Sequence, residues 1–444
     1  MSGELTTDVA VVGAGPAGAS AATTLARCGF RVLLADRARF PRDKCCGDGL
    51  TTGALRRLRA LGLDPAAVPS FTPVADLTLR SPSGRIARLP LGDGRELHAA
   101  VARRAELDAA LVDLARGAGA TVLEGHAFEE LQADADAGQV VVQLAGGVTV
   151  RASYLVGADG AWSPVHRAVD HPHEDRERAQ AHPGTRGAGR SRRRASGQGD
   201  WHAFRAYASG VGPEAAEHLW VWFDRTMLPG YAWSFPLAGG GANIGICMRR
   251  APGQRGSGLA ATWSALLDGP FLASLLGRDA VVEGPARSWP IPAGISERRL
   301  VALGGRVVFV GDAARAADPF TGEGIAQALE TGVAAAEAIA RVGSVSPGAV
   351  ARGYAEHVQA TLQREHRLSW LCTSLMAHPL AARGAVRVSG WNEWTRRNVG
   401  RWLYEDFPRT LAFTPSMWRR EALGGGTHSA PAGPDRARRP RPSG

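Results

Sequence analysis

The hydrophobic pattern at the start of the chain predicts a strand, a helix and a second strand. Residues 8–13, DVAVVG, form a short valine-rich run that ends in glycine, which is typical of a buried strand. Residues 16–28 are rich in alanine and predict a helix, and residues 30–37, FRVLLADR, predict the second strand. A unit of this kind, about 30 residues long, is the βαβ element of parallel sheets.

Later apolar runs extend this first domain. Leucines at helical spacing predict a helix over 101–118, and strands are predicted at four runs that begin at Thr121, Val140, Val148 and Tyr154. Much further on, VVFVGDAA predicts another buried strand, followed by a helix over about 322–341. The first domain is therefore expected to be assembled from separate pieces of chain.

Residues 77–91 and 202–248 have a different sequence pattern from the first domain. Short strand patterns alternate there with Gly and Pro turns, including a hairpin at Ser83-Gly84, and they predict an antiparallel sheet. Residues 351–420 are mainly helical in pattern. The expected fold class is α/β: a Rossmann-type domain, an inserted antiparallel-sheet domain and a helical C-terminal region.

The composition narrows the class of protein. A chain of 444 residues that is 45% hydrophobic suits a globular protein of two or three domains. No apolar run approaches the roughly 18 residues of a membrane-spanning helix, and the N-terminus lacks the pattern of an export signal. The five cysteines show no CxxC spacing, which disfavours a metal site or a disulfide scaffold and suits the cytoplasm.

The net charge of +10 is concentrated in two segments. Residues 173–194 carry +4 and residues 435–441 carry +3, and both segments lack apolar periodicity, so we expect them to be disordered. Nucleic-acid binding is disfavoured because this charge does not form a folded basic surface. Weak attraction to an anionic membrane surface, as a peripheral contact, fits the charge better.

The glycine turn GAGPAG predicts a dinucleotide site. Gly13, Gly15 and Gly18 follow a strand and open a helix, where backbone N–H groups and the helix dipole favour a pyrophosphate. Pro16 and Ala17 complete the turn. The second predicted strand ends at Asp36, whose carboxylate can accept hydrogen bonds from a ribose, with Arg37 following it.

Two later motifs make the chain similar to the flavoprotein hydroxylase superfamily, which binds FAD. They are GADGAWSPVHR, which begins at Gly157, and GDAARAADPFTGEGI, which begins at Gly311. The resemblance implies that Asp312 holds the ribityl chain, that the PFTGEG loop faces the isoalloxazine, and that Arg103 lies near the phosphates. The cofactor residues that it adds are Arg103, Asp159, Gly160, Gly311, Asp312, Pro319, Gly322, Gly324 and Ile325.

PRDKCCGDG narrows the resemblance to the geranylgeranyl reductase-like flavoproteins. Pro41, Lys44, Cys46, Gly47 and Gly49 match that family's P-x-x-K-x-C-G-x-G motif, and Lys44 is the chain's single lysine. The segment YAWSFP resembles the family's Y-x-W-x-F-P motif, which implies a substrate wall of Tyr231, Trp233, Phe235 and Pro236. Alternate residues of a strand share one face, so the three aromatic side chains should line one side of the second domain.

The resemblance implies a division of the chain into parts. The FAD-binding domain would comprise 1–70, 99–170 and 299–341; the substrate domain 71–98 and 201–298; a disordered insertion 171–200; a helical region 342–420; and a disordered tail 421–444.

The expected reaction is reduction of carbon–carbon double bonds in an isoprenoid or similar polyene. Cys46 would contact the flavin and give a proton, because a thiol with an ordinary pKa near 8.5 is protonated at pH 7, and Lys44 would tune it. The electron donor would be NAD(P)H or a protein such as ferredoxin, since the chain shows a single dinucleotide fingerprint.

The sequence leaves three other functions open. A flavin monooxygenase, which hydroxylates or epoxidises, would carry the same flavin motifs, and a flavin halogenase is a more distant enzyme alternative. A non-catalytic flavoprotein or lipid carrier would bind FAD without turnover.

Overall fold

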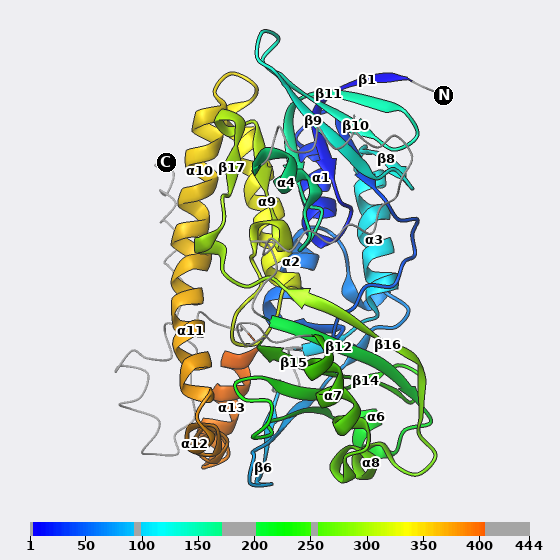
Figure 1. Cartoon of the computed structure of the whole chain (residues 1–444), viewed down its shortest axis with the longest axis vertical. Coiled ribbons are helices and arrows are strands. Elements are labelled where there is room, and N and C mark those ends of the chain that lie inside the picture. The colour runs from blue at the N-terminus through cyan, green and yellow to red at the C-terminus, as the bar shows by residue number, and fades with distance from the viewer. Residues whose placement is uncertain (1–2, 93–98, 171–200, 250–255, 405–444) are drawn as a thin grey trace, which may run out of the picture.

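The computed structural model describes residues 3–92, 99–170, 201–249 and 256–404. Two sheets lie at opposite ends of an elongated molecule, and long helices run along one side of it (Figure 1). The predicted insertion 171–200, the predicted tail 421–444 and residues 405–420 of the predicted helical region lie outside the described residues. The fold class is the expected one, while the residue boundaries of its parts stay predictions.

The first sheet contains the predicted βαβ unit. Its strands are β1 (Glu4–Val12), β2 (Val32–Asp36), β8 (Thr121–Glu124), β9 (Phe128–Asp134), β10 (Gln139–Leu144), β11 (Val148–Gly157), β17 (Val301–Ala302) and β18 (Val307–Phe309). The order is β17-β18-β11-β1-β2-β8, with β10 on β11 and β9 on β10, and β1 is parallel to both β2 and β11. The two strands predicted at Val148 and Tyr154 are one strand, and β9 was not predicted.

Alternation along β1 separates the two faces of this sheet. Val9 and Val11 pack on a core shared with α1 (Pro16–Arg27), α9 (Ile325–Val342) and α10 (Pro347–Val358). Ala10 and Val12 pack with β10 and α4 (Pro164–Asp170). β1 runs from the N-terminus toward the middle of the molecule, so its carboxyl end faces the second sheet (Figure 1). The helix predicted from Gly322 begins later, at Ile325, because Gly322 has a left-handed φ of 68°.

The second sheet joins the two predicted strand regions. Its strands are β5 (Asp76–Arg80), β6 (Ile86–Pro90), β12 (Trp201–Ser209), β13 (Leu219–Trp222), β14 (Tyr231–Leu237), β15 (Gly241–Arg249) and β16 (Val281–Ile291). The order is β16-β12-β15-β14-β13-β5-β6. The sheet is antiparallel, as predicted, except that β13 and β5 are parallel where the two chain regions meet.

Three helices that were not predicted cover one face of the second sheet: α6 (Pro213–Glu217), α7 (Gly256–Leu267) and α8 (Pro270–Leu276). α6 has only 5 residues and α8 only 7, and Gly269 with Pro270 separates α7 from α8, which leaves a weak periodic signal. Among the described helices, none is long and apolar enough to cross a membrane alone; α7 and α8 meet those criteria only as a bent pair. Leu259 and Leu272 of this pair are buried against the sheet.

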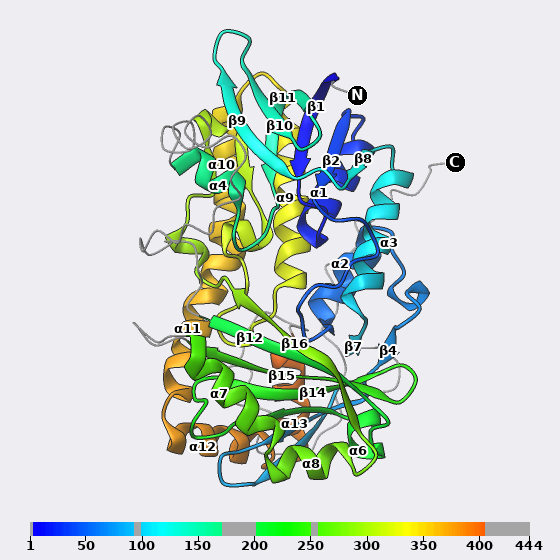
Figure 2. The ribbon, with the colours of Figure 1, turned by 45° about the vertical axis from the view of Figure 1, so that its right-hand side comes forward.

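The remaining elements surround the space between the sheets. They are α2 (Thr52–Ala60), α3 (Arg104–Gly117), α11 (Arg364–Met376), α12 (Pro379–Ser389), α13 (Glu393–Leu403) and a small sheet of β3 (Gly49–Thr51), β7 (Ala99–Val101) and β4 (Thr72–Pro73). α12 and α13 pack against β6, so the C-terminal helices close one end of the second sheet (Figure 2).

Candidate active site

A cavity of about 1090 Å³ runs between the two sheets. It begins at the turn between β1 and α1, passes the loop that precedes β3 and the N-terminus of α9, and continues between β14 and the C-terminal helices. A pocket for one drug-sized ligand measures roughly 300–1,000 Å³. This cavity therefore has room for a dinucleotide and for part of a second, apolar ligand.

The three glycines of the GAGPAG motif have different structural roles. A Cβ on Gly13 would lie 2.3 Å from the Ala158 oxygen, and one on Gly18 would lie 1.8 Å from the Gly13 oxygen. These two glycines therefore permit close backbone packing. A Cβ on Gly15 would project into the cavity and meet only the Arg42 guanidinium, at 3.7 Å. Gly15 also precedes the first turn of α1, so it leaves open a space that a pyrophosphate can fill.

Two carboxylates of the sequence motifs accept hydrogen bonds from the protein itself. Asp36 accepts from the N–H groups of Ala14, at 2.7 Å, and Ala38, at 2.8 Å, which fixes the glycine turn beside β2. Asp159 accepts from Ser163 and from the Val165 N–H at the start of α4. Burial raises the Asp159 pKa to about 6. Both residues line the cavity, and Asp159 is in addition a capping residue.

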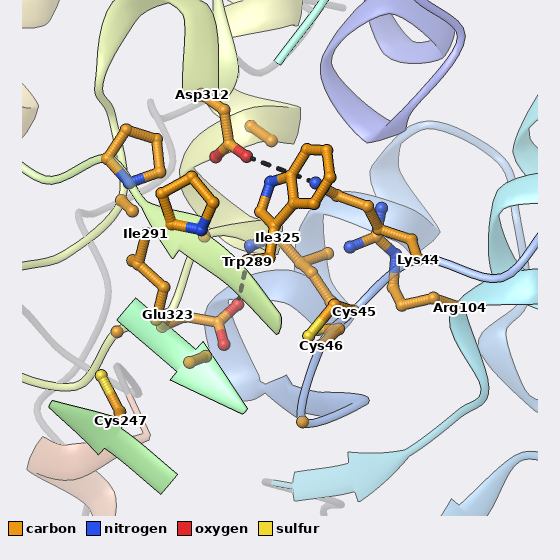
Figure 3. Close-up of a pocket in the computed structure, with 18 of the residues that line it drawn as sticks. Lys44, Cys45, Cys46, Arg104, Cys247, Trp289, Ile291, Asp312, Glu323 and Ile325 are labelled. Carbon is orange, nitrogen blue, oxygen red and sulfur yellow. Dashed lines mark hydrogen bonds and ion pairs between the residues drawn. The ribbon is translucent and has the colours of Figure 1, made fainter. Parts of the chain in front are cut away.

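Lys44 lies at the centre of the cavity. Its Nζ is 4.0 Å from an Asp312 carboxylate oxygen and 3.9 Å from the centroid of the Trp289 ring (Figure 3). Burial lowers the Lys44 pKa to about 8, although Asp312 opposes the change. The single lysine thus holds a charge between two of the sequence motifs, at the junction of the two domains.

The neighbouring cysteines have different surroundings. The Cys45 thiol donates to the Arg287 carbonyl oxygen at 3.4 Å, and burial raises its pKa to about 12. Burial also raises the Cys46 pKa, and the Arg104 guanidinium beside it opposes that change. Both thiols are therefore protonated at neutral pH. A Cys46 thiolate, once formed, would be stabilised by Arg104, whereas Cys45 has its proton directed to a carbonyl.

Of the two adjacent arginines Arg103 and Arg104, Arg104 lines the cavity. Arg103 is the N-cap residue of α3, and its guanidinium stacks on Tyr207 at 4.6 Å, outside the cavity lining. Arg104 donates twice to Asp108, at 2.8 and 2.9 Å, and Arg42 lies 3.0 Å from the same carboxylate. Two guanidinium groups share one carboxylate, which leaves a net positive charge beside the glycine turn.

A buried hydrogen-bond network ties the cysteine loop to the second sheet. Asp48, which has a left-handed φ of 63°, accepts from the Tyr207 hydroxyl at 2.8 Å and from the Asn243 amide at 2.9 Å. The Asn243 amide also donates to the Cys46 carbonyl at 2.9 Å, and its oxygen accepts from the Trp233 indole at 3.0 Å. Asn243 therefore links the two family motifs, although they lie far apart in the sequence.

Replacing Asn243 with leucine is expected to destabilise the protein and to slow turnover. The change removes partners from the Asp48 carboxylate, the Cys46 carbonyl and the Trp233 N–H, and one unsatisfied buried group costs about 1–3 kcal/mol. Denaturant unfolding measures the loss. Ser234→Ala is the matched control, because the buried Ser234 hydroxyl has no hydrogen-bond partner among the described residues. Equal stability of Asn243→Leu and Ser234→Ala would contradict the network's role.

The aromatic residues of β14 alternate as predicted. Tyr231, Trp233 and Phe235 line the cavity, while Ala232 between them packs into the opposite core with α7 and α8. The Tyr231 hydroxyl donates to the Thr321 carbonyl of the PFTGEG loop. Together these side chains form an apolar wall that faces the cysteine loop.

The PFTGEG loop closes the cavity at the start of α9. The Glu323 carboxylate accepts from the N–H groups of Ile325, at 3.0 Å, and Ala326, at 3.3 Å (Figure 3). A Cβ on Gly324 would meet nothing nearer than Ala317 at 3.7 Å, so the backbone is open to the cavity there. This loop therefore places the open Gly324 backbone, and the Glu323 carboxylate that caps the start of α9, next to Lys44 and Asp312.

Most of the residues that the sequence pointed to line the cavity. They are Gly13, Gly15, Pro16, Ala17, Asp36, Arg37, Lys44, Cys46, Gly47, Asp159, Gly160, Asp312, Gly322, Gly324, Ile325, Tyr231, Trp233 and Phe235. Those outside the lining are Gly18, Arg103, Gly311, Pro319 and Pro236. A Cβ on Gly311 would lie 2.8 Å from the Ala17 Cβ, so Gly311 serves packing between α1 and the loop that follows β18.

Sequence reasoning missed Trp289, which lies over Lys44. Its indole N–H is buried without a hydrogen-bond partner among the described residues, so it is a donor that a bound ligand can use. The segment SWPIP around it signals an edge strand, because proline cannot donate a ladder hydrogen bond and is found in sheets mainly at edges. Arg42, Arg104 and Asn243 were also missed. Within the described residues there is no cluster of side chains suited to a metal ion.

Comparisons with known proteins agree with this arrangement. Residues 6–183 match a family model described as an FAD binding domain. A menaquinone reductase of Mycolicibacterium smegmatis is 33% identical over 74% of this chain and 75% of its own. Digeranylgeranylglycerophospholipid reductase 2 of Methanopyrus kandleri is 32% identical over 75% of this chain and 76% of its own.

A solved structure shares the whole fold. The geranylgeranyl bacteriochlorophyll reductase-like protein of Thermoplasma acidophilum superposes with a TM-score of 0.70 at 21% identity, covering 92% of this chain and 98% of its own. At that identity the likeness concerns the fold alone.

Proposed function

The chain belongs to the geranylgeranyl reductase-like family of FAD-dependent oxidoreductases, and on this premise we propose that it reduces carbon–carbon double bonds of an isoprenoid or similar polyene. The observation that carries the proposal is the position of Cys46. Cys46 lines the same cavity as the open glycine turn and the apolar wall of β14, which supports a thiol proton donor that acts between the flavin and an apolar substrate.

The residues that would hold FAD form a continuous path. Gly15, the first turn of α1 and the Arg42–Arg104 pair suit the pyrophosphate, because they combine open backbone with net positive charge. Asp36 suits the adenosine ribose, and Asp312 with Lys44 suits the ribityl and ring end. When bound and reduced, FAD supplies the hydride for the reaction.

The side chains of the protein supply the rest of the chemistry. Tyr231, Trp233 and Phe235 would bind and orient the apolar chain and exclude water from it. The Cys46 thiol would donate the proton to the second alkene carbon, and Arg104 would stabilise the thiolate until a proton returns from solvent. Lys44 would hold positive charge at the cofactor. NAD(P)H or a reduced protein such as ferredoxin is the proposed source of electrons.

Turnover is expected to fall as the pH rises through about 8, where Lys44 loses its charge. Burial lowers the Lys44 pKa to about 8, so the ammonium is charged below that pH and neutral above it. In Lys44→Arg the guanidinium stays charged, so the falling limb of the pH–rate profile should move to higher pH. If the falling limb of the pH–rate profile stays near pH 8 in Lys44→Arg, a group other than Lys44 causes it.

The proposal is tested by reducing the purified protein with light under anaerobic conditions and then adding a panel of polyprenyl compounds. Reoxidation of the flavin by an unsaturated chain, and not by its saturated analogue, is the expected result. Reoxidation only when oxygen is admitted would favour a monooxygenase. A flavin that no substrate or reductant changes would favour a non-catalytic carrier.

A further inference from the structure

The outward faces of α11 and α12 carry a concentration of exposed apolar side chains. Twelve large apolar residues are exposed in the described part of the chain, and five of them lie within residues 371–391. They are Leu371 (55% exposed), Leu375 (57%), Leu380 (66%), Val388 (45%) and Trp391 (76%). Scattered exposed leucines need no explanation, but a cluster of this kind in two adjoining helices does.

The spacing of these residues places them on one face of each helix. Leu371 and Leu375 are four residues apart in α11, while Met376 beside them is buried and lines the cavity. In α12, Leu380 and Val388 are two helical turns apart, and the buried Val386 faces the cavity. Each helix therefore packs one side against the protein, with Met376 and Val386 reaching the cavity, and exposes apolar side chains on the other side.

The charge around the outward faces is mainly positive. Residues 366–392 contain three arginines, Arg367, Arg383 and Arg387, and the glutamates Glu365 and Glu393 flank this stretch. All three arginines are exposed. Exposed leucines on two helices, a tryptophan just after the second helix and arginines among them form a pattern typical of helices that lie in the headgroup region of an anionic bilayer.

The cavity reaches the same two helices from inside. Met376, Ala385 and Ser389 belong to its lining, and Ala385 is itself exposed, so the lining reaches the protein surface at α12. Both views show α11 and α12 at the end of the molecule that holds the second sheet (Figures 1 and 2). A ligand that leaves a bilayer at this face would enter the cavity next to the apolar wall.

We propose that the outward faces of α11 and α12, with Trp391, dock on an anionic lipid surface and bring the opening at Ala385 to the bilayer. The docking itself rests on the surface described above; that the bilayer delivers the substrate rests on the proposed function. The occupant is a membrane, because the arginine border complements anionic headgroups and the apolar cavity adjoins the surface.

Vesicle flotation of the full-length, FAD-loaded protein tests the proposal. Phosphatidylcholine vesicles with and without phosphatidylglycerol are compared for the wild type, for Leu375→Glu/Leu380→Glu and for Val345→Glu. Val345 is the matched control, because it is 89% exposed and lies between α9 and α10. We expect wild type and control to float with anionic vesicles and the double variant to bind at least about tenfold more weakly.

Three outcomes would overturn the docking proposal. One is a wild type that does not bind the anionic vesicles. Another is full binding by the double variant, which would assign membrane contact to the basic segments 173–194 or 435–441. The third is a wild-type dimer that the double variant dissociates, which would assign the face to a second copy. Turnover of a detergent-dispersed substrate is measured in parallel. A wild type that binds the vesicles but does not turn over this substrate would reject the proposed function and leave the docking proposal standing.

Discussion

Cys46→Ser is expected to slow substrate reduction by about 10²- to 10⁴-fold while FAD stays bound, which is the range of general-acid catalysis. Serine nearly keeps the size of cysteine, but its hydroxyl is a far weaker acid. The Cys46 thiol is protonated at neutral pH because burial raises its pKa, and the Arg104 guanidinium would stabilise the thiolate that proton donation leaves. The measurement is the single-turnover reoxidation of reduced protein by substrate without oxygen.

Cys45→Ser is the matched control for that experiment. Cys45 is adjacent in the sequence and lines the same cavity, but its thiol donates to the Arg287 carbonyl. We therefore expect the control to reduce substrate at nearly the wild-type rate. If Cys46→Ser also reacts at that rate, Cys46 is not the donor, and water or the Tyr231 hydroxyl would have to supply the proton.

The second large effect is expected for Gly15→Val, which should yield a folded protein without FAD. The Gly15 backbone has φ −73° and ψ −176°, a conformation that valine adopts readily. The added Cβ would project into the space beside Arg42, where the proposed pyrophosphate lies, and would meet only the Arg42 guanidinium within 4 Å. The flavin absorbance of the purified variant measures the loss.

Gly117→Val is the control for Gly15→Val, because a Cβ on Gly117 meets nothing within 4 Å and lies outside the cavity. It should retain one FAD per chain. Thermal unfolding shows whether each variant is folded. A Gly15→Val protein that purifies yellow, with the wild-type flavin content, would place the cofactor elsewhere.

Local patterns were enough to predict much of the fold. The glycine turn after β1 and the alternation of Tyr231, Trp233 and Phe235 depend on neighbours in sequence, and both are where the pattern placed them. The parallel pairing of β5 with β13 could not be predicted in this way, because residues 81–218 separate the two strands in the sequence.

The cavity residues that sequence reasoning missed have physical reasons in common. Arg103 and Arg104 are adjacent, and the start of α3 decides which of them faces the cavity; a one-residue shift in that start exchanges them. Asn243 and Trp289 carry no motif of their own. They matter because β15 and β16 bring them to the cysteine loop, which is a consequence of sheet order and cannot be read from spacing along the chain.

The mass of the product from a single anaerobic turnover tests the central claim most directly. Photoreduced, FAD-loaded protein is mixed with a polyprenyl substrate under strict exclusion of oxygen, and the lipid is extracted and weighed by mass spectrometry. The account predicts that each converted molecule gains two hydrogen atoms for each reduced double bond, in step with reoxidation of the flavin. An unchanged lipid without oxygen, and a product that carries an added oxygen atom once air is admitted, would contradict it.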